Sequence, residues 1–313
     1  MNETRKTISQ SAYGVWFWML TTMLFIIGFF VQDTSAAGPL LVYTVNYPLK
    51  YFAERIGGEH VRVEFPAPSD VDPAYWNPDL GNISAFQKAD MILLNGAGYA
   101  KWVAKVSLPR SKITDTSRQL RDRYITTKQV MTHSHGAAGK HAHEALAFTT
   151  WLDFELATKQ AEAIALAMGR KRPELRDTFQ SNYRKLATDL KGLDRDIEAI
   201  VSRNPATPLI VSHPVYDYFA RRYGLNIVSV HLEPDQVPTD SQLHALKEIL
   251  KQHPSKWMIW EGEPVRASVD KLKTLGVDSL VFDPCGNIPA RGDFMTVMQR
   301  NVEDLRRVFP MAD

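Results

Sequence analysis

The stretch PELRDTFQSNYRKLATDLKGLDRDIEAIVSR, residues 173–203, decides the fold. Its apolar side chains recur at steps of three and four residues, which places them on one stripe of an α-helix. They are Leu175, Phe179, Tyr183, Leu186, Leu190, Leu193, Ile197 and Ile200. Pro173 suits the first turn of such a helix, where its missing N–H would have no partner. The stretch predicts one helix of roughly 45 Å, and no sustained charge pattern beside the stripe indicates a coiled coil. We expect a rigid spine with a lobe packed at each end.

The composition bounds the class of protein. The 313 residues suffice for one large domain or two ordinary ones, and 44% hydrophobic with 23% charged residues is typical of a globular chain. A formal net charge of +2 gives no reason to expect a nucleic-acid partner. Cys285 is the single cysteine, which excludes an internal disulfide and a thiolate zinc cluster.

The N-terminal 37 residues have the pattern of a secretory signal. Arg5 and Lys6 precede an apolar run at residues 15–31, and Ser-Ala-Ala follows at residues 35–37. The apolar run is long for a signal peptide, so an uncleaved membrane anchor is the alternative. No cysteine follows the run directly, which argues against a bacterial lipoprotein anchor. In either case we expect the rest of the chain outside the cytoplasm.

Strand-like and helix-like segments alternate on both sides of the spine. Apolar runs predict strands at residues 40–45, 61–65, 91–96, 208–212, 226–230, 257–262 and 279–283. Helices are expected at residues 48–56, 82–89, 99–106, 152–168, 215–223, 240–252, 264–275 and 294–308. The alternation predicts an α/β fold in which two lobes with mostly parallel sheets are joined by one long rigid helix. The expected boundaries are 38–150 for the N-terminal lobe, 151–205 for the linking helices and 206–313 for the C-terminal lobe.

A histidine-rich segment interrupts the N-terminal lobe. Residues 119–147 are polar and contain THSHGAAGKHAHE at 132–144, so a surface loop is predicted at about 131–145. Its histidines can chelate a divalent cation without fixed geometry, and a solvated loop without a ligand is the alternative. They are His133, His135, His141 and His143.

Polar side chains also follow the predicted strands, at the ends where parallel-sheet folds bind ligands. In the second lobe they belong to SHP (212–214), HLE (231–233), EGE (261–263) and DPCG (283–286), and in the first to the loop at 66–80. A histidine and two or three carboxylates from separate strand ends can bind zinc or manganese. Each of them alone also has an ordinary structural role, such as opening a turn.

Six motifs in order carry a family resemblance. They are VDPAYWNP (71–78), FQKADMILLNGAGYAKW (86–102), TTWLD (149–153), SHPVYDYFARRYGL (212–225), WEGEPV (260–265) and VFDPCGN (281–287). Together they resemble the periplasmic substrate-binding proteins of zinc and manganese ABC transporters over nearly all of the chain beyond residue 37. The resemblance implies a binding protein rather than an enzyme, with Zn²⁺, or else Mn²⁺, as its cargo. It implies an inner-membrane permease and its ATPase as partners, and we expect a monomer.

The resemblance transfers to the site only in part. His213 and Asp283 match two ligands of the family, and Glu261 matches a glutamate near its site. The positions of two further ligand histidines are occupied by Ala74 and Thr149. A closed tetrahedral zinc site needs four ligands, so the set is incomplete.

Three outcomes follow from the incomplete set. Replacement ligands can come from Asp72, Tyr75 or His231, or from the loop histidines; the metal can be held loosely and handed on; or the cleft can bind another ligand against Tyr75 and Trp76. The leading hypothesis is therefore metal capture for uptake. A divergent member that binds another ligand, or acts as a metal chaperone or interaction protein, is the second. A metallohydrolase using His213, Asp283 and Glu261 is the third, without any HExxH motif to support it.

Overall fold

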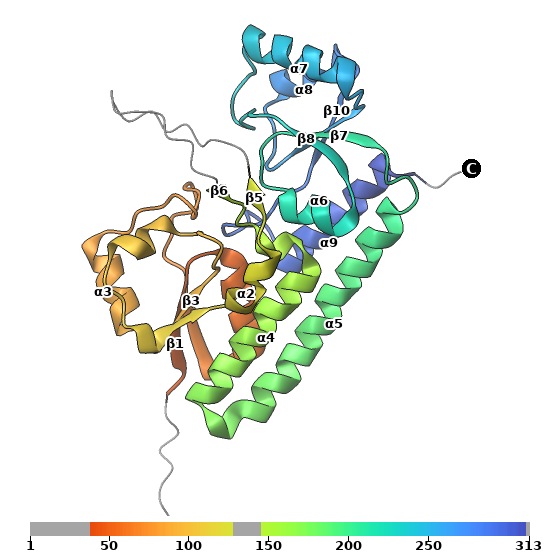
Figure 1. Cartoon of the computed structure of the whole chain (residues 1–313). Helices are drawn as coiled ribbons and strands as arrows, with labels where there is room; N and C mark the ends of the chain where they lie inside the picture. Colours follow the sequence, from red (N-terminus) through yellow and green to blue (C-terminus); the bar gives the residue numbers. More distant parts are fainter. Residues whose placement is uncertain (1–37, 128–144, 311–313) are drawn as a thin grey trace, which may run out of the picture. The chain divides into compact units, whose positions relative to one another are not determined.

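The computed structural model describes residues 38–127 and 145–310, whose course Figure 1 shows. The predicted signal or anchor at 1–37 and the four loop histidines lie outside these ranges. Pro39–Asp313 form one compact unit. In the described ranges, no helix combines the length and apolar character that crossing a bilayer requires.

The N-terminal lobe is built on a four-stranded parallel sheet with the strand order β2-β1-β3-β4. Its strands are β1 (Leu40–Thr44), β2 (Val61–Glu64), β3 (Met91–Leu94) and β4 (Ile113–Asp115), and its helices are α2 (Tyr47–Gly57) and α3 (Leu80–Lys88). The Asn46 side chain begins α2 by accepting a hydrogen bond from the Leu49 N–H at 3.1 Å. Asp79 begins α3 in the same way.

The predicted helix at 99–106 is a short 3₁₀ turn instead. Ala97 and Ala100 have φ angles of 50° and 53°, in the left-handed region that a right-handed helix excludes. Only residues 101–105 then turn as a 3₁₀ helix. The 3₁₀ turns are η1 (Gly58–His60), η2 (Lys101–Lys105), η3 (Arg110–Lys112), η4 (Arg118–Arg123), η5 (Thr150–Leu152) and η6 (Pro173–Leu175).

The C-terminal lobe repeats the parallel architecture, with the strand order β10-β9-β7-β8. Its strands are β7 (Pro208–Val211), β8 (Asn226–Ser229), β9 (Trp257–Trp260) and β10 (Asp278–Val281). Its helices are α6 (Asp217–Tyr223), α7 (Asp240–Gln252), α8 (Arg266–Lys273) and α9 (Phe294–Val308). Thr239 and Gln242 form a capping box at the start of α7, and Asp293 caps α9.

The predicted spine is confirmed as helix α5 (Arg176–Val201), preceded by the 3₁₀ turn η6. Its 26 residues span about 39 Å. Helix α4 (Phe154–Lys171) lies beside it (Figure 1). Most members of the predicted apolar stripe are buried, whereas Leu175 and Tyr183 are partly exposed. α5 contacts α2 of the N-terminal lobe and α9 of the C-terminal lobe, so it supports both.

The two lobes also contact each other directly. The rings of Phe52 on α2 and Phe294 on α9 meet edge to face, with centroids 5.3 Å apart. The indole N–H of Trp151 donates a hydrogen bond of 2.8 Å to the Pro284 carbonyl. The backbone N–H of Tyr47 donates one of 3.0 Å to the Gly286 carbonyl. A small antiparallel ribbon of β5 (Thr126–Thr127) and β6 (Ala145–Leu146) completes the fold.

Candidate metal centre

The loops that follow β7, β8 and β9 bring three polar side chains together. His213 follows β7, Glu233 follows β8 and Glu261 follows β9. β7 lies between β9 and β8, and all three strands run parallel, so their carboxyl ends meet at one edge of the sheet. This is the edge where ligands bind in open α/β sheets.

The imidazole of His213 lies between the two glutamates. Its Nε2 atom is 3.6 Å from a Glu233 carboxylate oxygen, and its Nδ1 atom is 3.8 Å from one of Glu261. One ligand atom from each of the three residues lies within 4.8 Å of the others. His213 and Glu261 are about one-quarter exposed and Glu233 about one-half, so the group is open to an entering ion. An imidazole and two carboxylates suit zinc or manganese.

The electrostatics of this group favour a cation. Burial first, and then the charges of Glu233, Asp72 and Asp283, together raise the pKa of Glu261 to about 7. Burial lowers the pKa of His213, although Glu233 opposes that shift, and this favours the neutral imidazole that binds metals. A divalent cation would relieve the repulsion among the carboxylates.

The N-terminal lobe contributes Asp72 and Tyr75 from the loop between β2 and α3. A carboxylate oxygen of Asp72 accepts a hydrogen bond from the Ala74 N–H at 2.9 Å. Burial raises the pKa of Asp72, and its negative charge favours the protonated form of His213. Burial likewise raises the pKa of Tyr75 to about 12, with smaller effects from Asp72 and Glu261. Asp72 and Tyr75, two of the three predicted substitutes, therefore interact electrostatically with members of the His213 group.

His231 and Asp283 lie around the group without belonging to it. The His231 ring is perpendicular to that of His213, with centroids 5.4 Å apart. A carboxylate oxygen of Asp283 accepts a hydrogen bond from the Cys285 N–H at 2.7 Å. The backbone of Asp283 is clamped by Asn301 of α9, whose amide both accepts from its N–H and donates to its carbonyl.

The loop that carries Asp283 is also fastened to the N-terminal lobe. The side-chain amide of Asn287 donates hydrogen bonds to the carbonyls of Pro68 and Val71, at 2.7 and 2.8 Å. Because Asp72 follows Val71, these bonds hold the loops with Asp72 and Asp283 to each other. The group of His213, Glu233 and Glu261 is therefore held near the carboxylate of Asp72 from the N-terminal lobe.

The two positions that lack a family histidine have structural roles. Ala74 is buried, and the hydroxyl of Thr149 donates a hydrogen bond of 2.6 Å to the Val215 carbonyl. Thr149 thus links the two lobes. The histidines at 133, 135, 141 and 143 lie outside the described residues.

The sequence did not single out Glu233 as a candidate ligand, although its segment His231-Leu232-Glu233 was noted. In the extended segment His231-Leu232-Glu233, the outer two side chains point to the same side of the chain. Leu232 is buried at 3% exposure and anchors the segment. The alternation therefore places His231 and Glu233 on the same side, and only the fold shows that the Glu233 carboxylate lies 3.6 Å from the His213 imidazole.

Comparisons with known proteins identify the family of this chain. A family described as "Zinc-uptake complex component A periplasmic" matches residues 42–308. The zinc-binding protein AdcA of Streptococcus pyogenes serotype M3 is 26% identical over 97% of this chain and 61% of its own length. The high-affinity zinc uptake system protein ZnuA of Bacillus subtilis is 27% identical over 87% of this chain and 88% of its own length. The chain thus spans 61% of the length of the AdcA relatives it matches.

Solved structures share the fold. The metal-dependent lipoprotein YcdH of Bacillus subtilis has a TM-score of 0.73 and 22% identity, covering 86% of this chain and 99% of its own. The predicted architecture of two α/β lobes with parallel sheets and a long helix is therefore confirmed.

Proposed function

Because the chain belongs to the family of periplasmic component A of zinc-uptake complexes, we propose that it captures a divalent metal ion, zinc above all, outside the cytoplasm. It would deliver this ion to a membrane permease driven by an ATPase. The names of its relatives support zinc as the cargo, and a manganese transporter lipoprotein, PsaA of Streptococcus mitis, at 22% identity supports manganese as the second metal.

The observation that carries this proposal is the group of His213, Glu233 and Glu261, whose ligand atoms lie within 4.8 Å of one another. Three ligands leave a coordination position open. We assign that position to Asp72, whose charge acts on both His213 and Glu261 from the opposite lobe. The resulting set of one imidazole and three carboxylates would replace the family set that Ala74 and Thr149 interrupt. Asp283 then supports the site through its charge and its loop.

Calorimetric titration of Pro39–Asp313 with Zn²⁺ and Mn²⁺ tests the assignment. Each of His213→Ala, Glu233→Gln and Glu261→Gln should weaken zinc binding by at least about 10–100-fold, the loss known for removing even a residue that supports a ligand. Glu248→Gln is the matched control, since Glu248 is an exposed glutamate of the same lobe that pairs with Lys251. It should bind zinc like the parent.

A variant without residues 128–144 separates the cleft from the histidine-rich loop. Zinc binding that survives this deletion but is lost in the three cleft variants supports the assignment. Binding lost only with the loop would move the metal site to the loop histidines. An absence of zinc and manganese binding in the parent would leave the cleft to another ligand and refute the proposal.

A further inference from the structure

Strand β10 leaves one edge of the C-terminal sheet open. It pairs with β9 on one side and has no strand on its other side within the described part of the chain. The N–H groups of Asp278 and Phe282 donate to the carbonyls of Lys256 and Trp260, each at 2.9 Å. Backbone groups alternate in direction along a parallel strand, so those of Ser279 and Val281 point away from β9, toward the open edge.

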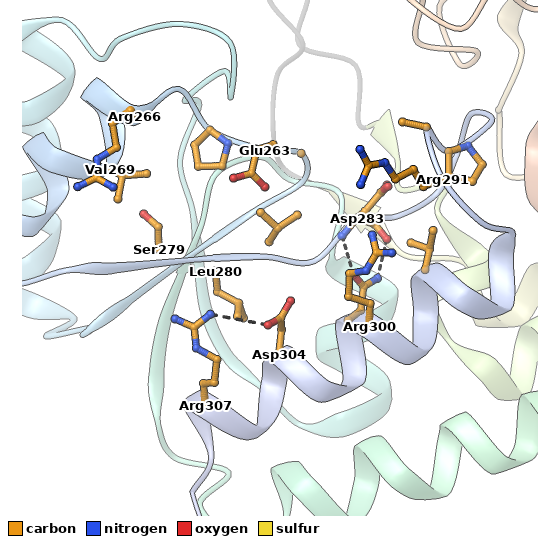
Figure 2. A pocket seen from close by; sticks show the side chains of 17 residues that line it. Glu263, Arg266, Val269, Ser279, Leu280, Asp283, Arg291, Arg300, Asp304 and Arg307 are labelled. Carbon is orange, nitrogen blue, oxygen red and sulfur yellow. Dashed lines mark hydrogen bonds and ion pairs between the residues drawn. The ribbon is translucent and has the colours of Figure 1, made fainter.

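A groove of about 690 Å³ runs along this edge, between α8 and α9. Figure 2 shows Ser279 and Leu280 on opposite sides of the strand, with Arg266 on the side of Ser279 and Arg300 and Arg307 on the side of Leu280. The volume lies within the range of ligand-binding pockets. The groove therefore offers unpaired strand groups on its floor and charged side chains on its walls.

The walls carry four arginines and three carboxylates, a small excess of positive charge, and Arg266 pairs with Asp270 at 2.9 Å. Arg266, Arg291, Arg300 and Arg307 line the groove, against Glu263, Asp283 and Asp304. Asp304 pairs with Arg307 at 3.7 Å, and a carboxylate oxygen of Asp283 accepts the hydrogen bond from Cys285. Across residues 38–127 and 145–310, no ion pair involves Arg291 or Arg300. Both arginines are exposed and can meet an acidic ligand, although the charge of Arg300 also acts on Asp283, where it opposes the rise that burial causes in the pKa of that carboxyl.

We propose that this groove binds an extended acidic segment of a partner protein, which adds to β10 as a further strand. Such a segment would pair with the backbone groups of Ser279 and Val281, as in recognition by strand addition. Its acidic side chains would face Arg300 of α9, which has no ion pair among the described residues. Its alternate, apolar side chains would face the α8 wall, where Val269 lies.

Other occupants fit the groove less well. A second copy of this chain, paired edge to edge, would bring the arginines of both copies against each other, which is unfavourable. A small anion would meet the guanidinium groups but leave the strand groups of Ser279 and Val281 unpaired. An extended acidic segment satisfies both features.

The test uses a short synthetic peptide of alternating glutamate and valine, with a lysine–valine peptide as its charge-reversed counterpart. Binding to Pro39–Asp313 is measured by fluorescence anisotropy of the labelled peptide. Arg300→Glu should weaken binding at least about tenfold, because it removes a hydrogen bond to a charged group and repels the peptide. Arg306→Glu is the control on the same helix, since Arg306 pairs with Glu303 outside the groove.

A second variant tests the strand pairing separately. Val281→Pro removes an N–H that points to the open edge and leaves the bonds to β9 intact, as edge strands tolerate. It should weaken binding about threefold to tenfold. A measurement without any variant is hydrogen exchange, in which the peptide should slow exchange of the Ser279 and Val281 amides.

Binding of the glutamate peptide alone, lost in Arg300→Glu and kept in Arg306→Glu, with slower exchange at Ser279 and Val281, supports the proposal. Three results would overturn it. They are no binding of the glutamate peptide, equal binding of the lysine peptide, and binding that leaves the exchange of both amides unchanged. Displacement of the peptide by inorganic phosphate at equal concentration would indicate a small-anion site and also overturn it.

Discussion

Asn301 clamps the loop that carries Asp283, and replacing it should destabilise the protein by a calculable amount. Its side-chain oxygen accepts from the Asp283 N–H at 3.1 Å, and its amide donates to the Asp283 carbonyl at 2.8 Å. Asn301 is 3% exposed. Asn301→Leu leaves two buried backbone groups unpaired at about 1–3 kcal/mol each, or about 2–6 kcal/mol in total. Asn301→Asp keeps the acceptor but places a buried carboxylate against the Asp283 carbonyl, so it should cost at least as much as Asn301→Leu.

Urea unfolding followed by tryptophan fluorescence measures both variants. With a slope of about 3 kcal/mol/M, the Leu variant should lower the midpoint by roughly 0.7–2 M and the Asp variant by at least as much. Asn226→Leu is the control, because Asn226 is an exposed asparagine of the same lobe. It should change the free energy of unfolding by no more than about 0.5 kcal/mol. A Leu variant within about 0.5 kcal/mol of the parent would refute the clamp.

Three further predictions concern stability. Asp293→Ala removes the cap of α9 and should cost about 1 kcal/mol at neutral pH. Burial alone would raise the pKa of Asp293, but hydrogen bonds from the α9 backbone hold this pKa below its usual value. The carboxylate therefore loses its stabilising effect when it is protonated, and the difference in unfolding free energy between Asp293→Ala and the parent should vanish in acid. A difference that persists in acid would contradict the capping role. Burial raises the pKa of Asp217, whose Oδ2 atom has no hydrogen-bond partner among the described residues, so stability should fall as pH rises from about 4. In Asp217→Asn the fall of stability with rising pH should be smaller. A pH profile of unfolding equal to that of the parent would contradict this role of Asp217. Trp151→Phe leaves the Pro284 carbonyl unpaired, so it should lower the free energy of urea unfolding by about 1–3 kcal/mol more than Trp102→Phe does. Trp102 is the control because it is also buried but lies inside the N-terminal lobe. Equal losses in the two variants would exclude a role for the bond between the lobes.

The long helix was predictable because its pattern is local. Apolar residues at steps of three and four occupy one face whatever packs there, and the buried members of α5 match them. The alternation of strands and helices likewise predicts two parallel sheets. The predicted helix at 99–106 was wrong, because the conformation there depends on the left-handed backbone of Ala97 and Ala100. No pattern of side chains signals that backbone conformation.

The site was predictable only in part. His213 and Glu261 follow strands that lie next to each other in the sheet, so both could be placed at one edge from the sequence. The choice between His231 and Glu233 depends on how the loop after β8 turns toward His213, which is a property of the fold. The role of Thr149 as a donor to Val215 depends in the same way on contact between distant segments.

The most direct test of metal capture is anomalous diffraction at the zinc edge from crystals of Pro39–Asp313 grown with zinc. We expect a strong peak in the cleft at roughly 2.0–2.2 Å from one ligand atom each of His213, Glu233 and Glu261. The same peak should be absent from crystals of Glu233→Gln grown in the same way. A zinc peak bound elsewhere, without ligand atoms of His213, Glu233 and Glu261 at this distance, would contradict the account.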